Sequence, residues 1–122
     1  MRVLGWPRLL NEYILETQKR YQREGFVWGR IDCVHFVGEW VKIATGEDYL
    51  SGHNYSTKGE ADALLEKEGS LYQALVSRLG EPIHPAKAQR GDIAYRKDEN
   101  ACGIYFTSGA YMMALFLGEG GF

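Results

Sequence analysis

Cys33 is the residue of this chain best placed for chemistry, because its sequence context puts it in the first turn of a helix. Asp32 is a suitable N-cap, apolar residues recur from Val34 onward with helical spacing, and Gly46 can end the helix. The dipole and free N–H groups of a helix N-terminus favour thiolate over thiol, although the Asp32 charge opposes this. Cys33 is therefore a candidate nucleophile. Its place on the apolar side of the helix equally suits a buried, inert cysteine.

A nucleophilic thiol needs a proton acceptor, and His35 is the histidine nearest to Cys33 in the sequence. The two residues are two positions apart, so on a helix their side chains point in roughly opposite directions. His35 shares its helix face with Glu39 and Lys42, which predicts a solvent-facing imidazole. We therefore do not expect His35 to reach Cys33.

The other two histidines of the chain lie in segments without a regular pattern. His53 belongs to an irregular loop after the Cys33 helix, and His84 precedes a proline that favours an extended backbone. Loop residues can fold over a cleft, so both remain candidate bases, although a loop or connector role is the commoner one. Trp28 and Tyr55 are candidates to line the same cleft.

The periodicity of apolar residues predicts helices first and strands last. Capping residues and terminal glycines indicate four helices, at Pro7 to Gly25, Cys33 to Thr45, Thr57 to Gly69 and Ser70 to Gly80. The later part of the chain alternates as strands do, at Asp92 to Tyr95, Ala101 to Phe106 and Tyr111 to Leu117. This order predicts an α+β fold, and 122 residues fit one domain over 1–122. Residues 117–122 are half glycine, which predicts an end that is flexible or ordered by a partner.

Composition and charge argue against several classes of function. A net charge of −2 without a cluster of Lys and Arg disfavours nucleic acid as a partner. The N-terminal segment lacks a secretory pattern and no apolar run has membrane-spanning length, so we expect synthesis in the cytoplasm, no signal peptide and no membrane span. Two cysteines are too few for a disulfide framework and match no zinc spacing. We expect reduced thiols, no metal and no cofactor.

Three short motifs resemble those of the NlpC-like cell-wall cysteine peptidases, a compact branch of the papain-like fold. They are a capped helix that begins at Asp32-Cys33, a Gly-Asp step before a strand at Arg90-Gly91-Asp92-Ile93, and a strand that contains Gly103-Ile104-Tyr105. The segment from Trp28 to Cys33 is still more similar to a set of phage-encoded proteins in that branch. The resemblance implies N-terminal helices packed on a small antiparallel sheet, and a place at the tail tip of a virion.

The resemblance also maps an active site onto this chain, and the mapping is incomplete. In the peptidases a His-x-Gly-Ile-Tyr pattern supplies the general base, and Ala101 stands in the place of that histidine. The following strand is apolar and offers no side chain to orient an imidazole. If Ala101 and Gly103 face Cys33, the alternation of a strand turns Cys102 away, which disfavours a Cys33–Cys102 disulfide. Gly103 would then allow a close approach of helix and strand.

Two hypotheses about function follow from this mapping. The first is a noncatalytic structural or assembly protein of a phage tail tip, made in the host cytoplasm, with other tail-tip proteins as its partners. The second is an active endopeptidase that cleaves peptidoglycan peptides, with Cys33 as nucleophile and His53 or His84 as base. A peptide-binding module or an enzyme of another kind remains as a third interpretation.

Overall fold

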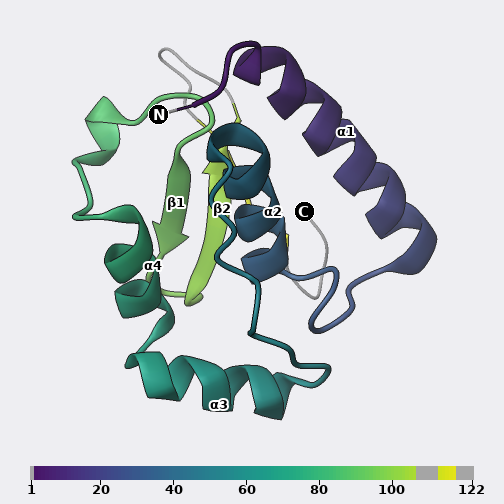
Figure 1. The fold of residues 1–122 in the computed structure, drawn as a ribbon, viewed down its shortest axis with the longest axis vertical. Helices are drawn as coiled ribbons and strands as arrows, with labels where there is room; N and C mark the ends of the chain where they lie inside the picture. The colour runs from purple at the N-terminus through teal and green to yellow at the C-terminus, as the bar shows by residue number, and fades with distance from the viewer. Residues whose placement is uncertain (1, 107–112, 118–122) are drawn as a thin grey trace.

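The computed structural model describes residues 2–106 and 113–117, and it confirms the predicted α+β class. Four helices precede three strands (Figure 1). The elements are α1 (Trp6–Glu24), α2 (Cys33–Thr45), α3 (Lys58–Glu68), α4 (Leu71–Leu79), a 3-10 turn (Pro85–Lys87), β1 (Ile93–Arg96), β2 (Ala101–Tyr105) and β3 (Ala114–Leu115).

The helices begin and end where their capping residues predicted. Asp32, Thr57 and Ser70 each have an extended backbone and accept a hydrogen bond from the N–H group three residues further on. Gly46 ends α2 in the left-handed conformation, with φ of 84°. These local signals therefore fixed the bounds of α2, α3 and α4 to within about one residue.

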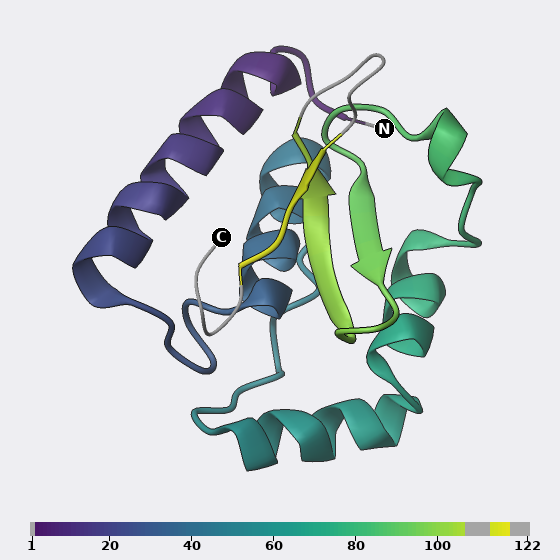
Figure 2. The same ribbon diagram turned by 180° about the vertical axis from the view of Figure 1, so that it is seen from behind.

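The three strands form an antiparallel sheet in the order β1-β2-β3, with β2 in the centre. Helix α2 lies against one face of the sheet, with α1 and α4 on either side of it, and Figure 2 shows the sheet from its other face. The third strand is shorter than predicted within the described residues and pairs with Ile104 and Tyr105 alone. Residues 107–112, which include the start of the predicted third strand, lie outside the described residues. So does the predicted glycine-rich end beyond Leu117.

The core forms where α2 meets α1 and the sheet. Its buried residues are Leu10, Tyr13, Ile14, Ile31, Phe36, Val37, Trp40, Val41, Ala44, Leu71, Cys102, Ile104 and Leu117. Trp40 is 1% exposed and donates its indole N–H to the carbonyl of Gly91 at 2.9 Å. This bond ties the middle of α2 to the turn that leads into β1. The packing thereby holds the first turn of α2 beside the start of β2.

Candidate functional site

Cys33 is the first residue of α2 and lies half-buried in the wall of a cavity of about 490 Å³. Helices α2, α3 and α4 and the loop between α2 and α3 enclose this cavity. Its apolar lining includes Val34, Val37, Val41, Leu50, Ala61, Leu64, Leu65, Leu71, Ala74, Leu75 and Leu79. The thiol therefore opens onto an apolar space large enough for a small ligand or a few side chains.

Four of the charged side chains in the wall of the cavity form two ion pairs. Lys58 binds Asp62 at 2.8 Å, and Arg78 binds Glu68 at 2.7 Å. The hydrogen bond and the charge of the Arg78 guanidinium hold the pKa of Glu68 below its ordinary value, and burial opposes this shift. The other two carboxylates in the wall, Asp32 and Glu99, bind His35 and Arg96, which lie outside it.

Cys102 is the side chain that faces Cys33 from the sheet. It is fully buried, and its thiol donates to the Cys33 carbonyl oxygen at 3.4 Å. The prediction that Cys102 points away from α2 is therefore wrong. Cys102 and Ile104, both 0% exposed, form the face of β2 that packs on the helix.

The same alternation turns Ala101 and Gly103 away from Cys33, which corrects the predicted arrangement at this position. A Cβ atom at Gly103 would lie 2.2 Å from the carbonyl oxygen of Leu115 and 2.8 Å from the ring of Phe116. Gly103 thus allows the close approach of Leu115 in β3 and of Phe116 after it, and not of α2 as the sequence predicts. The sequence pattern gave the alternation but not which face meets the helix.

The pKa of the Cys33 thiol is lowered to about 7. The hydrogen bond from the Cys102 side chain contributes most to this shift, burial of Cys33 opposes it, and a backbone hydrogen bond from Cys102 adds to it. The negative charge of Asp32 acts in the opposite direction. The Cys102 thiol, bonded to Cys33 and fully buried, has its pKa raised well above the ordinary value.

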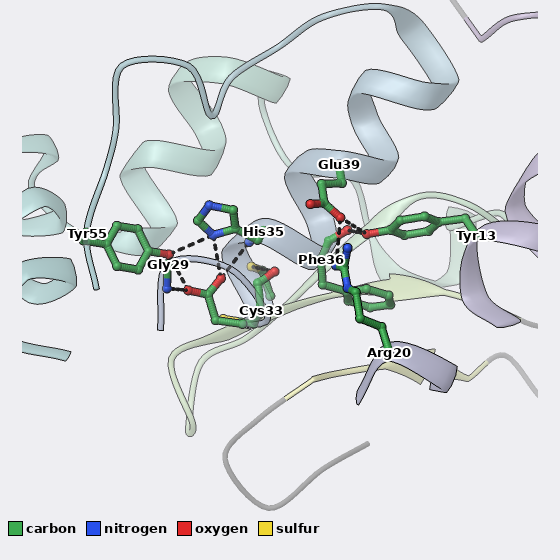
Figure 3. Close-up of polar contacts among 10 residues, drawn as sticks. Tyr13, Arg20, Gly29, Cys33, His35, Phe36, Glu39 and Tyr55 are labelled. Carbon is green, nitrogen blue, oxygen red and sulfur yellow. Dashed lines mark hydrogen bonds and ion pairs between the residues drawn. The ribbon is translucent and has the colours of Figure 1, made fainter. Parts of the chain in front are cut away.

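Asp32, the N-cap of α2, is bonded to Gly29, His35 and Tyr55 in a polar network, the Asp32 network; Figure 3 shows these three partners at the start of α2. Its Oδ1 accepts the backbone N–H of His35 at 2.8 Å and lies 2.9 Å from the Nδ1 atom of that residue. Its Oδ2 accepts the N–H of Gly29 at 2.8 Å and the hydroxyl of Tyr55 at 2.6 Å. Burial would raise the pKa of this carboxyl, but the hydrogen bonds outweigh it and lower the pKa.

His35 does not face solvent, so that prediction is wrong. Its side chain is only 15% exposed, and its ring meets the ring of Tyr55 edge-on at 5.5 Å. Tyr55 belongs to the loop between α2 and α3, which folds back over the first turn of α2. Gly29 permits this crossing, because a Cβ atom there would lie 1.7 Å from the carbonyl oxygen of Tyr55. Helical periodicity cannot predict that a loop covers the His35 side chain.

Among the described residues, which include all three histidines, no imidazole hydrogen-bonds the sulfur of Cys33. The Nδ1 atom of His35 is engaged by Asp32 and Tyr55. His53 lines the cavity, whereas His84 is exposed and accepts the N–H of Ala86 at 3.1 Å.

The cavity wall gathers five of the residues that the sequence singled out, which are Trp28, Asp32, Cys33, His53 and Tyr55. His84, Ala101 and Gly103 do not line it. Sequence reasoning missed Cys102 as the neighbour of Cys33 and His35 as a member of the Asp32 network. The spacing of three residues between Asp32 and His35 was an available signal, because such residues are neighbours on a helix.

A second polar cluster joins α2 to α1 on the other side of the helix (Figure 3). The Tyr13 hydroxyl donates to the carbonyl of Phe36 at 2.6 Å, and Arg20 binds Glu39 at 3.2 Å. Burial, followed by the charge of Glu39, raises the pKa of Tyr13. This cluster is distant from the cavity wall and holds α1 in place.

Comparison with known proteins gives one finding about the whole chain. A family model described as "Domain of unknown function (DUF6950)" matches residues 1–121. No curated protein and no solved structure gives a significant match. Within the described residues, no helix is both long enough and apolar enough to cross a membrane, and no group of three or more His, Cys, Asp or Glu residues could hold a metal ion.

Proposed function

Because the chain belongs to the DUF6950 family, whose description names no activity, we propose its function from the site and from its sequence resemblance. The protein is a noncatalytic structural or assembly component of a phage tail tip, built on the scaffold of an NlpC-like cysteine peptidase. Its partners are other tail-tip proteins, and its location is the virion.

One observation carries this proposal: the sulfur of Cys33 has no imidazole as a hydrogen-bond partner among the described residues. A peptidase of this type needs a base that takes the thiol proton and later gives it to the leaving amine. The side chain across from Cys33 is a second thiol, Cys102, whose raised pKa makes it a donor. The imidazole of His35, close in sequence, holds the Asp32 network together.

The location at a tail tip is supported by the sequence motifs alone. The segment from Trp28 to Cys33 and the Arg90 to Ile93 step resemble those of phage-encoded proteins of the NlpC-like branch. The test is to tag the protein in a phage that encodes it and to purify intact virions. We expect the tagged chain in the tail fraction, in fixed proportion to a major tail protein. A chain that stays in the lysate, with virions assembling normally after its deletion, would contradict the proposal.

A second candidate function is an active peptidoglycan endopeptidase. The observation that favours it is a thiol with a pKa of about 7 in the wall of an apolar cavity that His53 also lines. In this alternative, Cys33 attacks an amide carbonyl and His53 swings to the sulfur when the peptide binds. His84 cannot take this role without leaving its exposed turn.

Hydrolysis of purified cell-wall fragments separates the two candidates. We expect the same soluble products from the wild type and from C33A, that is, no hydrolysis that depends on the thiol. Release of peptide fragments by the wild type that is lost in both C33A and H53A would establish the peptidase. H84A is the matched control, because its imidazole lies outside the cavity.

A further inference from the structure

Two thiols from distant parts of the sequence meet at the site, and neither candidate function makes use of the second one. Cys33 comes from the first turn of α2 and Cys102 from β2, and both are free cysteines. The Cys102 thiol donates to the Cys33 carbonyl oxygen at 3.4 Å, and both cysteines line the same cavity. A disulfide between them would join elements that are already packed together.

The two thiols differ in their access to reagents. Cys33 is half-buried and lines the cavity, so a small molecule in the cavity can meet its sulfur. Cys102 lies in β2 and also contributes to the cavity wall, but it is 0% exposed. A small oxidant therefore reaches Cys33 first, and Cys102 reacts only with what Cys33 has become.

The two thiols also differ in reactivity, in the same direction. The pKa of Cys33 is about 7, so a large share of it is thiolate at neutral pH, which is the form that peroxides attack. The pKa of Cys102 is raised, first by its bond to the Cys33 sulfur and then by burial.

We propose that Cys33 is an oxidation site for peroxides, and that Cys102 converts the oxidised sulfur into a reversible Cys33–Cys102 disulfide. The sequence disfavours this pairing, because strand alternation would turn Cys102 away if Ala101 faced Cys33. The geometry that places Cys102 there instead is the basis of the proposal.

The reaction has two steps. The Cys33 thiolate attacks one oxygen of the peroxide, an S–O bond forms and the O–O bond breaks, and the departing oxygen takes up a proton. The Cys33 sulfur is thereby oxidised to a sulfenic acid. The Cys102 sulfur then attacks the Cys33 sulfur, the S–S bond forms as the S–O bond breaks, and the Cys102 proton leaves with the hydroxide as water. Two thiols and one hydrogen peroxide give one disulfide and two waters.

The disulfide would remove the thiolate from the cavity wall and fasten the start of α2 to the sheet. A small thiol reverses it by exchange at the Cys33 sulfur, which is the accessible one. The proposal goes beyond the assembly function and is independent of it, because the chemistry requires only the folded chain.

The test treats the reduced, purified full chain with one equivalent of hydrogen peroxide and measures its intact mass and peptide map. We expect a loss of two hydrogen masses, a peptide that joins Cys33 to Cys102, and recovery of both thiols with dithiothreitol. A Cys33 sulfinic or sulfonic acid with Cys102 still free would overturn the proposal. So would a disulfide between two chains as the main product.

Two variants resolve the order of events. In C102S, which keeps a hydrogen-bonding hydroxyl, Cys33 should stop at the sulfenic acid and be trapped by dimedone. In C33S, Cys102 should lose no thiol at the same dose of peroxide, because it is buried. Oxidation of Cys102 in C33S as fast as in the wild type would contradict the assigned order. The wild-type peptide map decides the proposal even if a variant does not fold.

Discussion

Asp32 and Cys33 are adjacent residues at the start of α2 and both line the cavity, yet their side chains have different partners. The Asp32 carboxylate is 1% exposed and accepts bonds from Gly29, His35 and Tyr55. The Cys33 sulfur opens onto an apolar cavity and has a thiol, Cys102, as its partner. Asp32, His35 and Tyr55 thus bond to one another, and His53 is the imidazole that shares the cavity wall with Cys33.

Residues that are neighbours in the sequence therefore need not form a catalytic pair. The helix directs the side chains of residues 32 and 35 to one side and that of residue 33 to another, and each side meets a different part of the chain. The loop that carries Tyr55 closes over Asp32, whereas β2 approaches Cys33. The hydrogen bonds around Asp32 stabilise the fold, and the surroundings of Cys33 make its sulfur reactive.

Replacing Asp32 should have the largest effect on stability. In D32N an NH2 group replaces one carboxylate oxygen. An NH2 group cannot accept the hydrogen bonds that the Gly29 N–H and the Tyr55 hydroxyl donate. Loss of these bonds in a buried site should lower the free energy of unfolding by about 3 kcal/mol, measured in urea. D62N, at an exposed ion pair, is the control and should cost less than about 1 kcal/mol.

The effect of D32N should also depend on pH. The folded state lowers the pKa of Asp32, so the stability that this group contributes is present above its unfolded pKa and is lost as pH falls through the folded one. The gap between wild type and D32N should therefore narrow below about pH 4. A gap that is constant down to pH 2 would show that the charge of Asp32 is not what stabilises the fold.

Removing the Cys102 thiol should have the next largest effect, and it acts on the Cys33 side of the comparison. In the wild type, alkylation by iodoacetamide should reach half its maximal rate near pH 7. In C102A the main cause of the lowered pKa is gone, so the midpoint should move toward about 8.5 and the rate at pH 7 should fall about tenfold. An unchanged midpoint in C102A would mean that the start of the helix alone activates Cys33.

The hydroxyl of Tyr55 should contribute a smaller amount of stability. In Y55F the Asp32 carboxylate loses one hydrogen bond but keeps those from His35 and Gly29. We expect a loss of about 1.5 kcal/mol in the free energy of unfolding. Y72F, at an exposed tyrosine, is the control and should be close to neutral. Equal effects of the two variants would remove Tyr55 from the Asp32 network.

His35 should have the smallest effect on the thiol, although it is the histidine nearest to Cys33 in the sequence. Since its ring is bonded to Asp32 and Tyr55, H35A should leave the alkylation rate of Cys33 at pH 7 within about twofold of the wild type. A fall of the rate together with a rise of the pH midpoint would show that His35 acts as a base toward Cys33. That outcome would contradict the separation of the Cys33 sulfur from the Asp32 network.

The parts of the fold that depend on local signals could be predicted from the sequence. Asp32, Thr57 and Ser70 cap their helices as their residue types and spacing indicate, and Gly46 ends α2. The alternation of β2 was predictable as well, but the face that packs on α2 was not. Either face of Ala101 to Tyr105 is apolar enough to be buried, so a one-residue choice of orientation had to come from tertiary packing.

The candidate site was predictable to the same extent. The place of Cys33 in the first turn of α2 follows from capping and periodicity, and these are properties of neighbouring residues. Whether its sulfur lies against Ala101 or Cys102 depends on a segment about seventy residues away. Whether His35 faces water or Tyr55 depends on a segment about twenty residues away.

The bounds of α2, α3 and α4, and the place of a cysteine at the start of α2, follow from the sequence, because backbone hydrogen bonding and side-chain period act over a few residues. What surrounds that cysteine depends on how distant segments pack. The burial of Trp40 against Gly91 and of Ile104 against α2 fixes the approach of helix and sheet, and that approach selects Cys102 as the partner of Cys33.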